Sequence, residues 1–292
     1  MAGQTAGHTA GRIPDQGGQQ GGQQGGGQGG QQGGRVAVVT GAARGVGAAV
    51  VQRMANEGWR VVAVDCCDDM PGLEYALGTE AQLKEVADPY PGTVLPVVAD
   101  VREEPALAAA VQLAIDEFGG LDAAVAAAAV MAGGRPLWET TDAEWDALYE
   151  VGLRGVLHLA RTAVPAMLAR PEPRSGRFVA IGSAAAHTGL WRLAAYNAVK
   201  HGVVGLVKGL AADLRGTGVS ATAVSPGSTD TAMLAATARL YGMDSPAPFA
   251  FQQHVERLLN PEEVAAAVCW LCGPDSSAVT GSVLHADGGF TG

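Results

Sequence analysis

Residues 36–47 read Val-Ala-Val-Val-Thr-Gly-Ala-Ala-Arg-Gly-Val-Gly, an apolar run followed at once by a glycine-rich turn. The run predicts a buried strand over residues 35–40, and the pattern beyond the turn predicts a helix over residues 46–57. Glycines 41, 45 and 47 let the backbone turn tightly between the two elements. A strand that passes through such a turn into a helix is the first unit of an α/β fold. This stretch therefore decides the fold class.

The same alternation continues to the end of the chain. Most of the apolar runs are continuous, which is typical of parallel strands covered on both faces. Six more strands are expected at residues 60–65, 93–99, 123–128, 177–182, 219–224 and 282–285. Helices are expected at residues 103–118, 142–168, 195–214 and 261–271, with irregular segments at 66–92 and 227–260, the second of them mobile. With right-handed crossovers, this order predicts a doubly wound parallel sheet with helices on both faces.

The first 34 residues differ in composition from the rest of the chain. From residue 17 to residue 34 nearly every residue is Gly or Gln. Such a segment buries too little apolar surface to offset the entropy lost on ordering. We therefore expect residues 1–34 to be a disordered tail, a flexible appendage or leader, with a Gln-rich association segment as the alternative. Residues 35–292 then form one α/β domain.

Composition narrows the class of protein. The 292-residue chain is 48% hydrophobic and carries a formal net charge of −10. Without a basic cluster, this charge argues against nucleic acid and anionic membranes as partners. No apolar run approaches the roughly 20 residues of a membrane-spanning helix. The N-terminus also lacks the apolar segment of a signal peptide, so the cytoplasm is the expected location.

The four cysteines, Cys66, Cys67, Cys269 and Cys272, could suggest zinc or redox chemistry. Cys269 and Cys272, however, stand in an apolar helical pattern, where cysteine behaves as a small hydrophobe. No histidine stands at the spacing that a zinc site requires. We therefore expect structural thiols and no metal site.

The glycine turn, residues 41–47, has the form of a cradle for a diphosphate, because helix N-terminal amides favour negative charge. As a string alone it is weak evidence, but its place after the first strand strengthens it. Asp65 ends the second predicted strand, where a carboxylate would bind ribose hydroxyls and repel a 2′-phosphate, so NAD is favoured over NADP. Arg44 could soften that preference. Asp100 either meets the adenine ring or serves as a helix N-terminal carboxylate.

The strongest motif is Tyr196-Asn-Ala-Val-Lys200. At a spacing of four, both side chains share one helical face. The lysine ammonium is expected to lower the tyrosine pKa and make Tyr196 a usable proton acceptor. Ser183, at the end of the fifth predicted strand, could hold a substrate oxygen against the phenol. A tyrosine and a lysine four apart are commonly surface residues, and it is the combination with Ser183 and the glycine turn that favours catalysis.

Together with Pro226-Gly-Ser-Thr-Asp-Thr231, these motifs resemble the short-chain dehydrogenase/reductase family over residues 35–292. The resemblance implies a seven-stranded Rossmann sheet, hydride transfer to or from NAD, and dimers or tetramers built on the two long helices. It also implies that Ser183, Tyr196 and Lys200 are catalytic, with Lys200 binding the nicotinamide ribose. The residues expected to contact the cofactor are Gly41, Arg44, Gly45, Val46, Gly47, Asp65, Asp100, Val101, Ala128, Tyr196, Lys200, Pro226, Gly227, Thr229 and Thr231.

Two departures from the family pattern stand out. The family usually has Asn-Asn-Ala-Gly where this chain has four alanines at residues 126–129, so a hydrogen-bonded brace of the sheet is expected to be missing. Gly152 replaces an Asn that anchors a water relay to the lysine, so Gly152→Asn is expected to raise turnover. These departures support a competing hypothesis, a catalytically weak NAD-binding regulator. The presence of Ser183, Tyr196 and Lys200 favours the enzyme.

The stretches at residues 65–70, 133–139 and 226–242 resemble mycofactocin-coupled short-chain dehydrogenases. This narrower resemblance implies that NAD is buried under the extra segment and reoxidised in place by mycofactocin as external electron acceptor. The alternative is an ordinary loop with exchangeable NAD. Apolar residues between 233 and 251 suggest an aliphatic or terpenoid-like alcohol or ketone. His187 and Trp191 could line the same pocket, or could be a surface histidine and a packing tryptophan.

Overall fold

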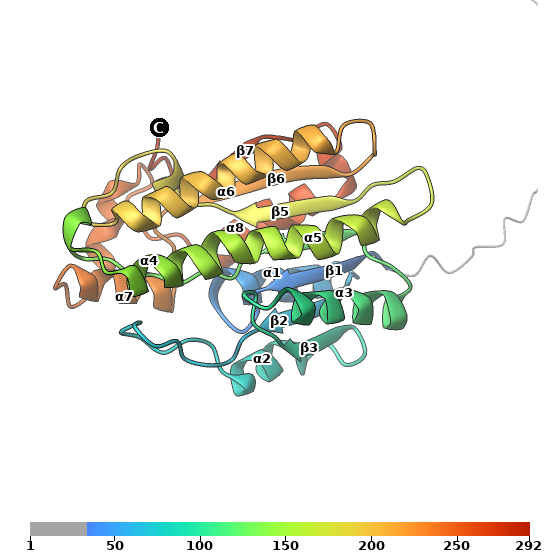
Figure 1. Cartoon of the computed structure of the whole chain (residues 1–292), viewed down its shortest axis with the longest axis horizontal. Coiled ribbons are helices and arrows are strands. Elements are labelled where there is room, and N and C mark those ends of the chain that lie inside the picture. Colours follow the sequence, from blue (N-terminus) through green and yellow to red (C-terminus); the bar gives the residue numbers. More distant parts are fainter. Residues whose placement is uncertain (1–33) are drawn as a thin grey trace, which may run out of the picture. The chain divides into compact units, whose positions relative to one another are not determined.

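Seven parallel strands form one sheet in the order β3-β2-β1-β4-β5-β6-β7 within residues 34–292, the part of the chain that the computed structural model describes (Figure 1). The predicted doubly wound sheet is confirmed. The expected tail lies outside the described residues, Gly34 excepted. The strands are β1 (Val36–Thr40), β2 (Arg60–Asp65), β3 (Val94–Val98), β4 (Ala123–Ala126), β5 (Arg177–Ile181), β6 (Ser220–Pro226) and β7 (Val283–Ala286).

Helices cover both faces of this sheet. Helices α3, α5 and α6 lie over one face, and α1 and α8 lie behind the other (Figure 1). The helices are α1 (Gly45–Asn56), α2 (Glu80–Ala87), α3 (Glu104–Phe118), α4 (Asp142–Tyr149), α5 (Gly155–Leu168), α6 (Ala194–Asp213), α7 (Ala232–Leu240) and α8 (Pro261–Cys272). Pro261 opens α8 as its first residue, where proline has no hydrogen bond to lose.

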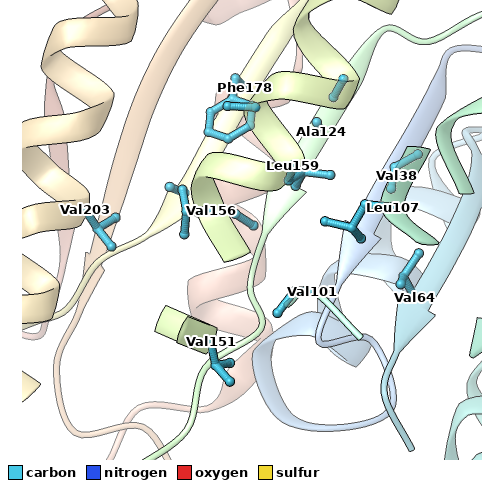
Figure 2. Packing of buried hydrophobic residues seen from close by; sticks show 14 of the residues in the cluster. Val38, Val64, Val101, Leu107, Ala124, Val151, Val156, Leu159, Phe178 and Val203 are labelled. Carbon is cyan, nitrogen blue, oxygen red and sulfur yellow. The ribbon is translucent and has the colours of Figure 1, made fainter. Parts of the chain in front are cut away.

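Successive side chains of each strand point to opposite faces of the sheet, so the core consists of two clusters, one on each face. Val38 packs into the cluster under α3 and α5, whereas its neighbour Val39 packs into the cluster under α1 and α8. In Figure 2 the side chains of Leu107, Leu159 and Phe178 meet between helices and sheet, and all three are fully buried. Each such side chain stabilises the fold by about 1.5–3 kcal/mol. Because helices cover both faces of the sheet, its central strands need apolar side chains on both faces.

The single helix expected over residues 142–168 is wrong. The chain forms α4 and α5 with one π-helical turn between them, Glu150–Arg154. Gly152 lies in this turn and faces Val199 of α6 so closely that an added Cβ would come within 2.9 Å of Val199 Cγ1. The π turn widens the helix where α6 passes against it. Such turns interrupt α-helices frequently at functional sites.

Both segments expected to be irregular contain helices. Helix α2 lies within residues 66–92 and begins with a capping box, in which Thr79 Oγ1 accepts from Gln82 N–H and Gln82 Oε1 accepts from Thr79 N–H. Helix α7 lies within residues 227–260, and Thr231 caps it by accepting from Leu234 N–H. These expectations were wrong because short helices carry little apolar periodicity, although the Thr-x-x-Gln capping signal was present in the sequence.

The order of the strands places a crevice at the carboxyl ends of β1 and β4. Strand β1 pairs with β2 on one side and with β4 on the other, so the connections diverge there. In doubly wound sheets, ligands bind outside the carboxyl ends of the strands at this point. Gly41, which follows β1, lies so close to the segment after β4 that an added Cβ would be 2.7 Å from Ala128 N.

Two further properties bear on expectations from the sequence. Cys269 and Cys272 are buried in α8 and pack in its core cluster, as expected for structural thiols. Burial raises the pKa of the Cys269 thiol to about 12. Within residues 34–292, no helix combines the length and the apolar character needed to cross a membrane.

Candidate active site

A cavity of about 610 Å³ lies at the carboxyl ends of β1, β4, β5 and β6. Every cofactor-contacting or catalytic residue that the sequence nominated lines it, from the glycine turn to Thr231. These residues come from six separate connections of the chain. The structure therefore brings the whole predicted set together in one cavity.

The glycine turn is built for close approach. Gly41 and Gly45 have φ values of +69° and +57°, which residues with a Cβ rarely adopt. Helix α1 begins at Gly45 and has no acidic residue in its first turn. The first N–H groups of a helix have no acceptor within the helix, and here they stand at the cavity wall. The turn can hold a diphosphate without competition from a nearby carboxylate.

Asp65 is fixed at the far end of the same wall. Its Oδ2 accepts from Ala43 N–H at 2.9 Å, and its Oδ1 accepts from Cys67 N–H at 3.3 Å. Arg44 lies instead near Tyr75, with its guanidinium carbon 5.8 Å from the ring centroid. The carboxylate therefore faces the cavity with no arginine paired to it among the described residues, as a site for ribose hydroxyls requires.

The carboxylate of Asp100 forms an ion pair with Arg102, which neither expected role included. Its carboxylate accepts from Arg102 Nε at 2.8 Å and from Arg102 N–H at 2.8 Å. Burial opposes ionisation, but the hydrogen bonds from Arg102 outweigh it and hold the pKa of Asp100 below its usual value. Glu103, not Asp100, is the N-cap of α3. Asp100 thus lines the cavity as part of an ion pair.

The segment of four alanines at residues 126–129 is held by side-chain hydrogen bonds from Thr40. Thr40 Oγ1, at the end of β1, accepts from Ala127 N–H at 3.2 Å and from Ala128 N–H at 3.3 Å. The hydroxyl also donates to the Val125 carbonyl at 3.4 Å. Thr40 is buried. A side chain from β1 therefore ties the carboxyl ends of β1 and β4 together, although the four alanines contribute no side-chain hydrogen bond of their own.

Tyr196 projects from α6 toward Ser183, which follows β5. Burial raises the pKa of Tyr196 to about 12, although the hydrogen bond with the Ser183 hydroxyl acts in the opposite direction. Ser183 Oγ also accepts from Ala185 N–H at 3.1 Å, which fixes the position of this hydroxyl. The expectation that the pKa of Tyr196 is lowered is therefore wrong. Tyr196 carries its proton at neutral pH.

Lys200 lies one turn further along α6 and is 3% exposed. Its Nζ donates to the Ile181 carbonyl at 2.9 Å and lies 5.7 Å from the centroid of the Tyr196 ring. Burial lowers the pKa of Lys200 to about 8. The ammonium is thus turned toward the end of β5 and loses part of its charge near neutral pH.

The substrate side of the cavity is apolar. Met233 and Leu234 of α7, with Tyr241, Met243 and Phe249 beyond it, line the same cavity as Ser183. Of the other expected lid residues, Leu240 packs against the core and Phe251 is exposed. Trp191 lines the cavity as expected. His187 does not: it is an exposed residue whose Nε2 lies 2.8 Å from Ser225 Oγ.

Tyr75 is a feature that the sequence reasoning missed. It belongs to residues 66–79, which we call the strap, between β2 and α2. Met131 N–H donates to the Tyr75 hydroxyl at 2.9 Å, across 56 residues of chain. Met70 and Leu77 of the strap are buried and line the cavity. An isolated tyrosine in a polar segment carries no signal in the sequence that could have identified this contact.

Comparisons with known proteins agree with this geometry. The sequence model of the family described as enoyl-(acyl carrier protein) reductase matches residues 41–291. The cis-4-hydroxycyclohexanecarboxylate dehydrogenase of Sinomonas cyclohexanicum is 35% identical over 88% of this chain and 96% of its own length. The (−)-trans-carveol dehydrogenase of Rhodococcus erythropolis is 32% identical over 88% and 97%.

A solved structure extends the likeness to the fold. The carveol dehydrogenase from Mycobacterium avium, in complex with NAD, superposes with a TM-score of 0.83 at 31% identity, covering 90% of this chain and 99% of its own. The likeness thus spans the sheet and the cavity alike. The chain therefore belongs to the short-chain dehydrogenase/reductase family and is an oxidoreductase that acts on alcohols or their carbonyl counterparts.

Proposed function

We propose that this chain is an NAD-dependent dehydrogenase that interconverts an apolar alcohol and its ketone. The observation that carries the proposal is that Ser183, Tyr196 and Lys200 line the same cavity as the glycine turn and Asp65. A binding module would need the turn and the carboxylate, but not a tyrosine paired with a serine hydroxyl in a buried site. This combination favours the enzyme over the NAD-binding regulator.

The residues that line the cavity suit each part of a dinucleotide in turn. An added Cβ at Gly41 or Gly47 would clash with the backbone, and the first N–H groups of α1 have no acceptor within the helix, which suits a diphosphate. Asp65 suits the hydroxyls of the adenosine ribose, and would repel the 2′-phosphate of NADP. Residues 226–231 and Lys200 would hold the nicotinamide end. When bound, NAD supplies the atom that accepts or donates hydride.

The protein groups divide the remaining work. The Ser183 hydroxyl, fixed by Ala185 N–H, can orient the substrate oxygen. Tyr196 holds a proton on its hydroxyl and can donate it to that oxygen as a carbonyl is reduced. In alcohol oxidation Tyr196 must first lose its own proton, because only the phenolate can accept the proton of the alcohol, and a positive charge beside the phenol favours that form. The apolar wall from α7 excludes water from the reacting atoms.

We further propose that NAD stays bound through turnover and is reoxidised in place by mycofactocin. The strap supports the first half of this proposal. It meets the glycine turn, because an added Cβ at Gly78 would be 2.8 Å from Ala43 Cβ, and it meets the segment after β4 through Tyr75 and Met131. Asp69 Oδ1 accepts from Leu77 N–H at 2.7 Å, which closes the strap on itself. Release of NAD would require these contacts to open.

A two-part experiment tests the enzyme and the retention of NAD. Denaturing release and mass analysis of the purified protein should recover NAD rather than NADP. Turnover should then be compared with free NAD and with an artificial electron acceptor. Activity only through the acceptor supports retention, whereas empty protein that turns over free NAD leaves the ordinary dehydrogenase with exchangeable cofactor.

The variant Tyr196→Phe separates the enzyme from the regulator. The enzyme should lose turnover, by the factor of about 10²–10⁴ that a positioned acid or base contributes, and should keep its NAD. Asn197→Ala is a matched control on the same turn of α6, since its amide donates to the Leu190 carbonyl and not to the cavity. Full activity of Tyr196→Phe would leave the regulator as the better proposal.

We also propose that α5 and α6 form the contact of a homodimer or homotetramer. Helix α6 exposes small residues at intervals of seven, four and three on its outer face, namely Ala198, Gly205, Gly209 and Ala212. Small side chains allow two helices to approach closely. Light scattering of the wild-type protein and of Gly209→Gln tests this, because the variant should dissociate while remaining folded.

A further inference from the structure

We propose that the substrate half of the cavity admits uncharged cyclic alcohols and rejects their carboxylate-bearing counterparts, with stacked Trp191 and Tyr241 as the selecting wall. This inference rests on the proposed alcohol dehydrogenase function, because it concerns the same cavity. It adds the charge of the substrate and the residues that select it.

The wall joins two segments that are distant in sequence. Trp191 precedes α6, and Tyr241 follows α7. Their ring centroids are 5.9 Å apart with the planes 15° from parallel, and Phe249 meets Tyr241 edge-on at 6.0 Å. The Tyr241 hydroxyl donates to the Trp191 carbonyl at 2.6 Å. All three rings line the cavity, and flat apolar surfaces of this kind suit the faces of an alicyclic ring.

Contacts made by the neighbouring residue, Arg192, hold Trp191 beside the cavity although the backbone of Arg192 is strained. Arg192 has φ of +57°, a conformation that costs free energy for a residue with a side chain. It persists because Gly134 N–H donates to the Arg192 carbonyl at 3.0 Å and the Arg192 guanidinium lies 4.2 Å from the Trp191 ring centroid. The surroundings therefore hold a tryptophan that is 69% exposed in a fixed place at the cavity. Strain of this kind gathers at ligand sites.

Arg192, whose guanidinium stacks on Trp191, is exposed and does not line the cavity, and the charged residues that do line it lie away from the wall. Among the described residues, the charged ones that line the cavity are Arg44, Asp65, Asp100 and Lys200. The first three surround the glycine turn and the end of β2. The ammonium of Lys200 is engaged by the Ile181 carbonyl. The segment from α7 to Phe249 contributes Met233, Leu234, Thr237, Tyr241, Met243 and Phe249 to the lining, none of which carries a charge at neutral pH.

A carboxylate placed between this wall and the buried ring of Phe249 would lose part of its hydration and would find no cationic partner in the lining from α7 to Phe249. An unpaired buried ion is disfavoured by several kcal/mol even after relaxation. We expect binding at least about 100-fold weaker than for a neutral analogue of the same shape, since each factor of ten corresponds to about 1.4 kcal/mol. The hydroxyl of either molecule can reach Ser183 and Tyr196 equally, so the difference arises at the wall.

Two probes isolate the charge. Methyl cis-4-hydroxycyclohexanecarboxylate and the free carboxylate share the ring and the hydroxyl and differ in charge. Their affinities for the NAD-loaded Tyr196→Phe variant, measured by calorimetry, report binding without turnover. We expect the ester to bind and the carboxylate to bind at least about 100-fold more weakly. Equal affinities, a preference for the carboxylate, or no binding of the ester would overturn the proposal.

Variants then locate the selection. Trp191→Ala should weaken ester binding about tenfold through lost ring contact, whereas Trp270→Ala, on α8, should not change it. Met243→Lys places an ammonium in the lining and should raise carboxylate affinity, whereas Met243→Gln, of similar length and neutral, should not. Unchanged selectivity in Met243→Lys and unchanged ester affinity in Trp191→Ala would remove the wall from the proposal.

The outcome for this inference is separable from the outcome for the proposed function. If Tyr196→Phe prefers the ester and the wild-type protein oxidises neither probe with NAD or with an artificial acceptor, the proposed dehydrogenase fails while the charge selection stands. If the wild-type protein oxidises the carboxylate as efficiently as the ester, the dehydrogenase stands and the charge selection fails.

Discussion

Replacing Tyr75 by phenylalanine should release NAD faster if the strap retains the cofactor. The change removes one hydroxyl, the acceptor for Met131 N–H at 2.9 Å, and leaves the ring beside Arg44. A neutral hydrogen bond contributes about 1 kcal/mol, and a partly buried N–H left without a partner adds up to about 2 more. At about 1.4 kcal/mol per factor of ten, NAD dissociation should accelerate about 5- to 100-fold.

The assay follows retained nucleotide directly. NAD-loaded protein is freed of excess nucleotide by gel filtration, and the nucleotide remaining on the protein is measured by denaturing release over time. Tyr90→Phe is the matched control, because the Tyr90 hydroxyl makes no hydrogen bond within residues 34–292 and Tyr90 packs on the other face of the sheet. Equal retention by Tyr75→Phe, Tyr90→Phe and the wild-type protein would refute the strap as the barrier to release.

Three further changes test other parts of the site. Asp65→Ala should raise the affinity for NADP relative to NAD, because the repulsion of a 2′-phosphate is removed; an unchanged ratio in titrations would contradict the assignment of this carboxylate. Gly152→Asn should lower the melting temperature, because overpacking against Val199 costs about 1–3 kcal/mol. Adding Val199→Ala to this variant should restore the melting temperature. A rise in kcat of the double variant above that of the wild-type protein would support a restored water relay. The folded-state pKa of Lys200, about 8, lies below its usual value of 10.5. Between these two values the unfolded state binds one proton more than the folded state, so the free energy of unfolding should rise with pH across that window. Lys200→Met should lose this rise in melting curves taken between pH 8 and pH 10, and an identical rise in both proteins would show that Lys200 is not the cause.

Local patterns were sufficient for most of the fold. The strands lie within two residues of their expected bounds, because an apolar run that must be covered on both faces is a property of consecutive residues. The residues proposed from the sequence as catalytic or cofactor-contacting all line one cavity, because each stands near the carboxyl end of a strand or on one face of a helix. The alternation of strands and helices then places those ends at one edge of the sheet.

Features that depend on the meeting of distant segments were missed. The π turn at Glu150–Arg154 forms where α6 passes, and Thr40 of β1 bonds to the backbone of Ala127 and Ala128 beyond β4. The contact of Tyr75 with Met131 likewise joins segments with no shared pattern. Such contacts depend on which atoms the packing brings within about 3 Å, and a sequence pattern records spacing along the chain rather than distance in space.

The sequence by itself determined that a tyrosine and a lysine share a helical face near a serine and a glycine turn, since a period of 3.6 residues is a local property. Only the tertiary structure decided the protonation of that pair. The pKa of Tyr196 is raised to about 12 and that of Lys200 lowered to about 8, both through burial. Burial withdraws water from a charged group in proportion to everything that packs around it, and that surrounding is assembled from the entire fold.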